Sequence, residues 1–145
     1  MLNKCKIEGI IIGKCVHVAA YYSLQRAGKF VLVDFSGLSS RVAVYSSSDD
    51  YCGQVMTNPS VPQRYENLHS GPVTLRKYVI IDVNSCILSN VEIGYGPAIG
   101  AFSLVSENIG DFTIVVGVPA KPKLYRKQNF VELEKQFLNS DLNQK

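Results

Sequence analysis

Two histidines and a pair of neighbouring aspartates are the residues of this chain best suited to move protons. The histidines are His17 and His69, and an imidazole accepts protons near neutral pH because its ordinary pKa is about 6.5. The aspartates are Asp49 and Asp50, and a carboxylate beside an imidazole can orient the ring for general-base catalysis. A lone carboxylate is a weak base unless burial raises its pKa. These four residues are therefore candidates for acid–base chemistry.

The same residue inventory argues against a bound metal. Two histidines without a nearby third ligand do not supply a catalytic metal site. The cysteines have neither the spacing of a zinc site nor that of a redox motif; they are Cys5, Cys15, Cys52 and Cys86. Because the N-terminus does not resemble a secretory signal, we expect reduced thiols and a cytoplasmic protein.

The composition is that of a strand-rich globular domain. Hydrophobic residues make up 46% of the 145-residue chain and charged residues 19%, which excludes a disordered chain. Valine (17) and isoleucine (11) together account for 28 residues, and β-branched side chains favour strands. No apolar run approaches the roughly 18 residues of a membrane span, so we expect no such span.

A basic cluster lies near the C-terminus of a chain whose net charge is only +3. A cluster of this size favours a phosphate-bearing small ligand over a nucleic-acid-binding face. Tryptophan is absent, as are the aromatic motifs that read RNA, so we expect no nucleic-acid partner. The cluster consists of Lys121, Lys123, Arg126 and Lys127, with no acidic residue among them.

Large aliphatic residues recur at every sixth position. A helix has a period of 3.6 residues and a simple strand a period of two, so neither produces this spacing. A six-residue unit is a short strand plus a corner turn, and such units must stack to bury their aliphatic side. An eight-residue step between two of the series places a bulge within Gln25–Lys29. The series are Ile12, Val18 and Leu24; Leu32, Leu38 and Val44; and Leu75, Ile81, Ile87, Ile93, Ile99 and Val105.

This repeat and one closing motif resemble a known family. An aliphatic residue, sometimes followed by glycine, and a small residue four positions later are similar to the hexapeptide repeat of left-handed parallel β-helix acyltransferases. Residues 91–105, and residues 114–121 ending in Gly117-Val-Pro-Ala-Lys121, resemble the end of their acetyl-CoA-binding domain. The resemblance covers residues 7–127 and points most closely to small sugar acetyltransferases of the galactoside and xenobiotic types.

The resemblance implies an all-β fold. We expect a left-handed parallel β-helix over residues 1–127, with a protruding loop at 46–72 that leaves the helix beside the active site and reaches a neighbouring subunit. Residues 128–145 are expected to form a short C-terminal α-helix and tail, and the helical spacing of apolar residues in Phe130–Leu138 independently favours that helix. Because the family's sites lie between subunits, a homotrimer is implied.

The implied activity is transfer of an acetyl group from acetyl-CoA to a hydroxyl or amino group of a sugar or nucleotide-linked sugar, for a surface polysaccharide. The transfer would be direct, assisted by a general base, because no cysteine or serine has an obvious base beside it. Two alternatives remain open at this point. One is a non-catalytic β-helix that binds or assembles, and the other is an antibiotic acetyltransferase.

The family resemblance also suggests the base. In galactoside and maltose acetyltransferases the base histidine opens the loop in a Thr-x-Thr-His-Pro motif, and Asp49 occupies that position here. The family's asparagine from the adjacent subunit counts back to Ala19, two residues from His17. The interpretation is that His17 of one subunit is the base and faces Asp49 or Asp50 of the next.

The binding residues follow in the same way. For coenzyme A the resemblance implies backbone contacts at two positions and phosphate contacts from basic side chains; these are Val83, Ala101, Lys121, Lys123 and Arg126. Glu107 stands where the family often has a lysine and would repel a phosphate. In the loop, polar side chains suited to sugar hydroxyls or a nucleotide diphosphate are candidates for acceptor binding; they are Tyr51, Asn58, Arg64 and His69.

Overall fold

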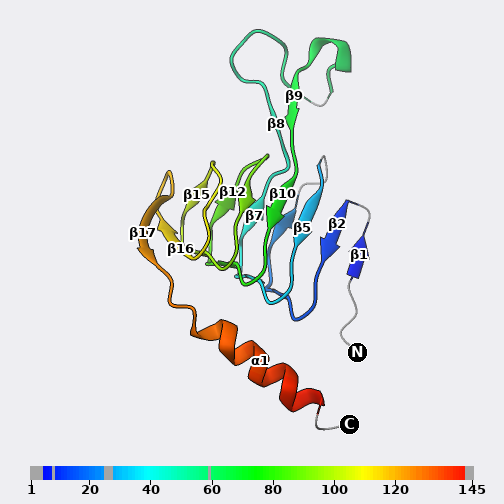
Figure 1. The fold of residues 1–145 in the computed structure, drawn as a ribbon. Helices are drawn as coiled ribbons and strands as arrows, with labels where there is room; N and C mark the ends of the chain where they lie inside the picture. The colour runs from blue at the N-terminus through cyan, green and yellow to red at the C-terminus, as the bar shows by residue number, and fades with distance from the viewer. Residues whose placement is uncertain (1–4, 8, 25–27, 59, 143–145) are drawn as a thin grey trace.

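The chain winds into a stack of triangular coils (Figure 1). The computed structural model describes residues 5–7, 9–24, 28–58 and 60–142. Each coil contributes one short strand to each of three sheets, so the predicted parallel β-helix is confirmed. Most of the predicted bulge, Gln25–Ala27, lies outside the described residues.

The sheets are named here in the order in which the chain first enters them. Sheet A has β1 at one edge, paired antiparallel with β2, and is otherwise parallel: β1 (Cys5–Ile7), β2 (Ile10–Ile12), β5 (Phe30–Leu32), β10 (Val73–Leu75) and β13 (Glu92–Ile93). Sheet B is parallel except at β17: β3 (His17–Val18), β6 (Gly37–Leu38), β11 (Ile80–Ile81), β14 (Ala98–Ile99), β16 (Thr113–Val116) and β17 (Lys121–Tyr125). Sheet C is wholly parallel: β4 (Ser23–Leu24), β7 (Ala43–Val44), β12 (Cys86–Ile87) and β15 (Leu104–Val105).

The six-residue series forms the core. Parallel pairing puts each member directly above its equivalent in the preceding coil, as with Leu32, Leu75 and Ile93 in sheet A. From the second coil onward the members of the series are at most 2% exposed; they are Leu32, Leu38, Val44, Leu75, Ile81, Ile87, Ile93, Ile99 and Val105. Burying one such side chain stabilises the fold by about 1.5–3 kcal/mol, and the series supplies one on each strand from β5 to β7 and from β10 to β15.

The corners between sheets use the left-handed backbone conformation. At the corner between sheets A and B the φ angles of Phe35, Tyr78 and Phe112 are 58°, 63° and 51°. At the corner between sheets B and C, Asn84 and Phe102 have φ angles of 59° and 56°. This conformation costs a non-glycine residue free energy, so its repetition shows that the stacked coils determine the turn.

The C-terminal helix α1 (Asn129–Leu142) packs against the A–B corner. Its Phe130 ring lies 4.9 Å from that of Tyr78 and 6.3 Å from that of Phe112, and its Phe137 ring lies 6.3 Å from that of Phe35. The predicted helix is confirmed and is longer than the apolar spacing at Phe130–Leu138 suggested. Among the described residues, no helix has the length and apolar character needed to cross a membrane.

One excursion interrupts the coils between β7 and β10. Residues 47–70, called the arm here, project from the β-helix (Figure 1). Its two ends pair as the antiparallel strands β8 (Ser47–Asp49) and β9 (Leu68–Ser70), and a short 3₁₀ turn, η1 (Gln63–Tyr65), lies near its tip. Ser46 fixes the root, because its hydroxyl accepts from the Gly28 amide and its carbonyl from the Gly71 amide.

Candidate active site

A pocket of about 330 Å³ lies where the arm joins the β-helix. The start of the arm and the returning strand β9 form one side, and the turns after β12 and β15 contribute Leu88, Ser89 and Ser106. Four residues predicted for catalysis or acceptor binding line this arm-base pocket: Asp49, Asp50, Tyr51 and His69. Residues that are far apart in the sequence therefore meet at one place.

The pairing of β8 with β9 explains which side chains share a face. Ser48 lies opposite His69, and Asp49 lies opposite Leu68. Successive side chains alternate between faces, so Asp50 lies on the same face as Ser48 and is a diagonal neighbour of His69. Asp49 lies on the opposite face and is exposed.

Asp50 is the buried acid of the pocket, only 7% exposed. Its Oδ1 accepts a hydrogen bond from the Cys52 amide at 2.8 Å, and its Oδ2 accepts one from Nδ2 of Asn67 at 3.3 Å. The Cys52 amide and the Asn67 side chain, in that order, hold the pKa of Asp50 below its usual range because they stabilise the carboxylate. Asp50 is therefore an anion that organises its neighbours and not a proton acceptor.

His69 and Cys52 are the groups that Asp50 influences. The His69 Nε2 atom lies 3.9 Å from Oδ2 of Asp50, which is ion-pair distance but too long for a direct hydrogen bond. The His69 side chain is 63% exposed and lines the pocket. A hydrogen bond to Asp50 raises the pKa of the Cys52 thiol, so the carboxylate suppresses the reactive thiolate.

The two other predicted acceptor-binding residues lie farther along the arm and do not line the pocket. The Asn58 side-chain oxygen accepts from the Ser60 amide at 2.9 Å, which closes a local turn. The Arg64 guanidinium stacks over the Tyr65 ring at 4.8 Å from its centroid. Within one chain both side chains therefore make local contacts within the arm.

His17 is exposed at the start of β3, where it pairs with Gly37 in sheet B. The arm leaves the β-helix between sheets C and A, and His17 does not line the arm-base pocket. The structure of one chain therefore brings His69 to Asp50, and it leaves His17 on a different sheet.

The residues predicted to bind coenzyme A occupy the B–C corner and the C-terminal end. Val83 and Ala101 precede the left-handed corner residues of successive coils, and the Val83 carbonyl accepts from the Phe102 amide at 3.0 Å. Lys121 and Lys123 are exposed on β17. The register of β17 on β16 shifts at Lys123, since Leu124 pairs with Ile114 and Pro122 with Val115, so the two lysines flank a β-bulge.

Arg126 is used differently from the prediction. Its Nη1 donates to the carbonyl of Tyr78 at 2.7 Å and to that of Gly96 at 3.0 Å, and the guanidinium lies over the Phe130 ring. Its contacts to the A–B corner and to α1 make Arg126 a structural residue in this chain.

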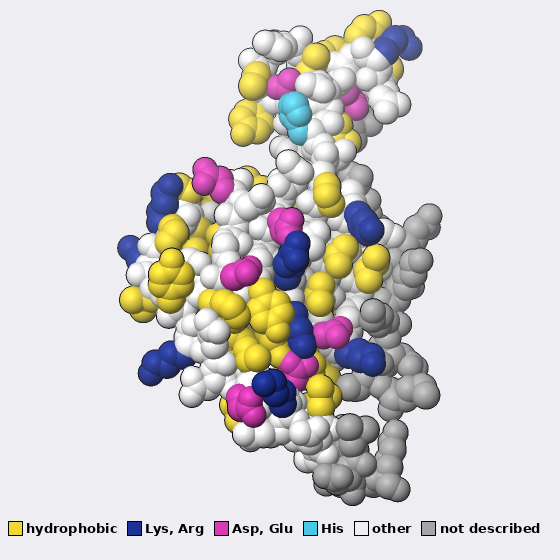
Figure 2. Space-filling view, viewed as in Figure 1, with side chains coloured by type: hydrophobic (Ala, Val, Ile, Leu, Met, Phe, Trp, Pro, Cys, Tyr) yellow, Lys and Arg dark blue, Asp and Glu magenta, His cyan; other side chains and the backbone are white. Residues whose placement is uncertain are grey.

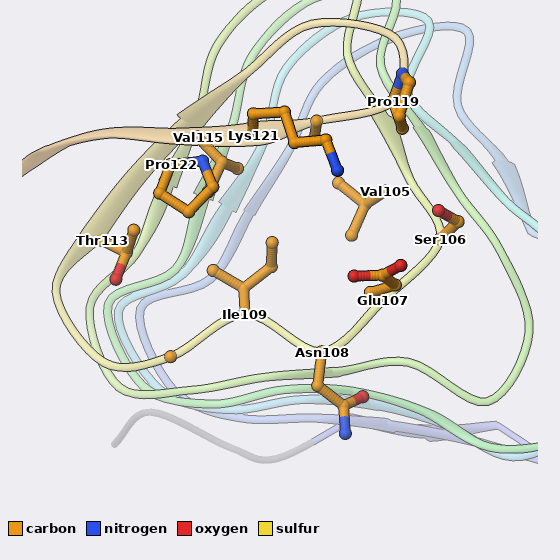
Figure 3. A pocket seen from close by; sticks show the side chains of 12 residues that line it. Val105, Ser106, Glu107, Asn108, Ile109, Thr113, Val115, Pro119, Lys121 and Pro122 are labelled. Carbon is orange, nitrogen blue, oxygen red and sulfur yellow. The ribbon is translucent and has the colours of Figure 1, made fainter.

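A smaller cavity, of about 170 Å³, lies at the C-terminal end of the β-helix (Figure 3). Val105, Ile109 and Val115 give it an apolar floor. Lys121 and Glu107 both line it, so a cation and an anion share the space. The carboxylate expected to repel a phosphate therefore lies in the same cavity as one of the two exposed lysines.

The chain is similar to characterised acyltransferases over nearly its whole length. No protein-family model matches it. It is 45% identical over 129 residues to dTDP-4-amino-4,6-dideoxy-D-glucose acyltransferase of Escherichia coli, covering 89% of this chain and 67% of that protein. The chain belongs to the hexapeptide-repeat acyltransferase family. The predicted family and enzyme class are thereby confirmed.

Solved structures agree with this assignment. The acyltransferase superposes on AntD, an N-acyltransferase from Bacillus cereus, in complex with dTDP and 3-hydroxybutyryl-CoA, with a TM-score of 0.86 and 43% identity over 90% of this chain and 70% of AntD. It also matches the acetyltransferase VCA0836 of Vibrio cholerae, with a TM-score of 0.72 and 21% identity over 83% of this chain and 65% of that one, which supports the fold alone. A shorter match, 35% identical over 66 residues, covering 46% of this chain and 34% of the relative, is to the putative lipopolysaccharide biosynthesis O-acetyl transferase WbbJ of Escherichia coli.

Sequence reasoning missed two members of the acyltransferase's pocket network, Cys52 and Asn67. Both act through Asp50, and neither belongs to a recognisable motif. The alternation of β8 and β9 would have indicated Asn67, since it lies opposite Asp50 once the strands are paired.

Proposed function

We propose that this acyltransferase transfers an acetyl group from acetyl-CoA to the amino group of a nucleotide-linked amino sugar. The observation that carries the proposal is the arm-base pocket, which combines two carboxylates and a histidine in a chain so similar to a dTDP-amino-sugar acyltransferase. AntD, which shares the fold, has also been solved with dTDP-4-amino-4,6-dideoxyglucose and coenzyme A. Similarity to WbbJ supports a role in surface-polysaccharide synthesis.

The acidic pocket favours an amine over a hydroxyl as acceptor. Sugar amines are largely protonated at neutral pH, and a carboxylate attracts the ammonium form and accepts its hydrogen bonds. Asp49 is exposed, and no hydrogen bond or ion pair of its carboxylate is described within this part of the chain. Its backbone carbonyl accepts a hydrogen bond from the Ser48 hydroxyl. Asp49 is therefore our candidate for binding the amine, with the phenol of Tyr51 close by for a sugar hydroxyl.

The donor is expected at the C-terminal coils. Exposed Lys121 and Lys123 are suited to the phosphates of coenzyme A, and the corner backbone at Val83 and Ala101 is suited to the pantetheine amides. Arg126 is removed from this set because its guanidinium already binds backbone carbonyls. Coenzyme A would supply the activated thioester, and these residues would only hold and orient it.

A homotrimer is part of the proposal. The arm carries large exposed apolar side chains that project from its own β-helix (Figure 2), among them Tyr51 at 87% and Leu68 at 50% exposed. A neighbouring copy would cover them, and Asn58 and Arg64 of the arm would then contribute to an acceptor site between copies. His17 of the neighbour would be brought to the arm by the same assembly, which keeps it as a candidate base beside Asp49.

Two further assignments accompany the proposal. The β-helix, residues 1–127 with its excursion at 46–72, is proposed as the catalytic unit, and residues 128–145 as a supporting segment. The free thiols of Cys15, Cys52 and Cys86 support a reducing cytoplasmic location.

The test is an assay with dTDP-4-amino-4,6-dideoxyglucose and acetyl-CoA. Thiol release and an amide product detected by mass spectrometry are the expected outcome. dTDP-glucose, which has hydroxyls but no amine, is the matched control and should release thiol far more slowly. Binding of acetyl-CoA without transfer to any amino sugar would favour a non-catalytic module, and transfer to aminoglycosides alone would favour an antibiotic acetyltransferase.

A further inference from the structure

His69 and Asp50 occupy one face of the β8–β9 hairpin at the wall of the arm-base pocket. Every hydrogen bond described for the Asp50 carboxylate comes from the arm itself: from the Cys52 amide, the Cys52 thiol and the Asn67 side chain. The carboxylate is therefore fixed before any ligand or neighbouring copy arrives. The exposed side chain of His69 lies within ion-pair distance of Oδ2 of this carboxylate.

We infer that Asp50 is a positioning residue for His69, and that His69 accepts the proton lost by the acceptor amine. This inference rests on the proposed function. The Nε2 side of the ring faces Asp50, so the geometry favours the tautomer with its proton on Nε2. The Nδ1 lone pair is then left for the substrate, and Asp50 stabilises the imidazolium that forms.

The proton balance is complete within this scheme. The bound ammonium first releases one proton to solvent. The neutral amine then attacks the thioester carbonyl, forming a C–N bond and a tetrahedral adduct, and the second proton passes to Nδ1 of His69. Collapse of the adduct breaks the C–S bond, and the imidazolium returns that proton to the departing thiolate. The products are an amide and free coenzyme A, so no other reactant is needed.

The surroundings of His69 support the base role. The other titratable groups that line the same pocket are Tyr45, which follows β7, and four consecutive residues of the arm, Asp49, Asp50, Tyr51 and Cys52. Of these groups, Asp50 lies within ion-pair distance of the His69 ring. Asp50 itself is a poor base, because its hydrogen bonds lower its pKa, and the same carboxylate keeps Cys52 in the thiol form.

The decisive experiment compares three variants in the amino-sugar assay. His69→Asn should lower kcat by about 10²–10⁴-fold, with KM for acetyl-CoA nearly unchanged, and the acid limb of the pH profile should disappear. Asp50→Asn should lower kcat by a smaller factor, about tenfold, because it misplaces the ring without removing it. Gln63→Ala, exposed in η1 and outside the pocket, should behave as wild type and controls for damage to the arm.

Other outcomes are equally informative. A wild-type kcat in His69→Asn overturns the assignment and returns the base role to His17. The same holds if His69→Asn is less active but its pH profile keeps the acid limb. Nitrogen-15 spectra of the histidine rings test the positioning without any acceptor. The nitrogen-15 resonances of the His69 ring should differ between the wild type and Asp50→Asn, because the variant removes the anion 3.9 Å from Nε2, and an unchanged spectrum overturns the role of Asp50. An inactive wild-type enzyme would contradict the proposed function while leaving this spectroscopic result to decide the positioning.

Discussion

The ammonium group of Lys77 lies 2.7 Å from both carboxylate oxygens of Glu134. Lys77 belongs to the A–B corner turn, and Glu134 lies in the second turn of α1, 57 positions along the chain. Nζ of Lys77 also lies over the rings of Phe35 and Tyr78. This ion pair and the aromatic contacts of Phe130 together attach α1 to the β-helix.

Glu134→Gln should loosen the attachment of α1. It leaves a half-buried ammonium without its anion, which we expect to cost about 2 kcal/mol of folding free energy. Amide hydrogen exchange should become faster throughout α1 and stay unchanged in the coils. Glu132→Gln is the matched control, because among the described residues Glu132 pairs with exposed Lys135 of the same helix and not with the β-helix. Equal effects of the two variants would contradict a docking role for the Lys77 pair.

Removing both exposed lysines of β17 should weaken coenzyme A binding. Each exposed charge contributes up to about 1 kcal/mol, so Lys121→Ala with Lys123→Ala should raise Kd roughly tenfold at low salt. The effect should shrink at high salt because the contacts are screened. The control is Lys14→Ala with Lys135→Ala, which changes the net charge equally at other sites. Isothermal titration calorimetry measures both values of Kd. If the control pair weakens coenzyme A binding as much as the β17 pair, the phosphates do not bind at Lys121 and Lys123.

The Asp50 carboxylate should make stability depend on acid pH. Its pKa in the folded protein lies below the usual value near 3.8, so its stabilising contribution is complete above that value and is lost as pH falls through the folded pKa. Thermal unfolding of Asp50→Asn should therefore occur at a lower temperature than wild type at pH 7. The difference should shrink as the pH falls below the usual value near 3.8 and through the lower pKa of the folded protein. Asp49→Asn, with an exposed carboxylate, should leave the unfolding temperature close to wild type at both pH values.

Cysteine alkylation offers an independent test of the same network. Asp50 raises the pKa of Cys52, so Asp50→Asn should increase the thiolate fraction and speed the reaction of Cys52 with iodoacetamide at pH 8. Burial raises the pKa of Cys86, which should react slowly in both proteins and serves as the internal reference. Peptide mass mapping over time measures both rates. An unchanged Cys52 rate would show that the carboxylate does not control this thiol.

The sequence by itself determined the β-helix and the family. Burial in a stacked coil imposes a fixed six-residue period, and that constraint is local enough to be read directly, from Leu75 through Val105. The C-terminal helix was predictable from its own local period, since the apolar residues of Phe130–Leu138 recur at helical spacing, although Leu133, Phe137 and Leu138 are exposed in the structure. Its continuation to Leu142 was not, because Asn139, Ser140 and Asp141 are polar and add no apolar spacing.

Only the tertiary structure decided how the candidate site residues are grouped. The arm has no repeating pattern, so nothing local determines that Ser48 pairs with His69, and that register is what places His69 beside Asp50. The partners of Arg126 could not be predicted from the sequence either, because a guanidinium can bind a phosphate or backbone carbonyls equally well. The fold decides between them by placing the carbonyls of Tyr78 and Gly96 beside it. Contacts between distant segments depend on pairing and packing of the whole chain, and residue type alone does not encode them.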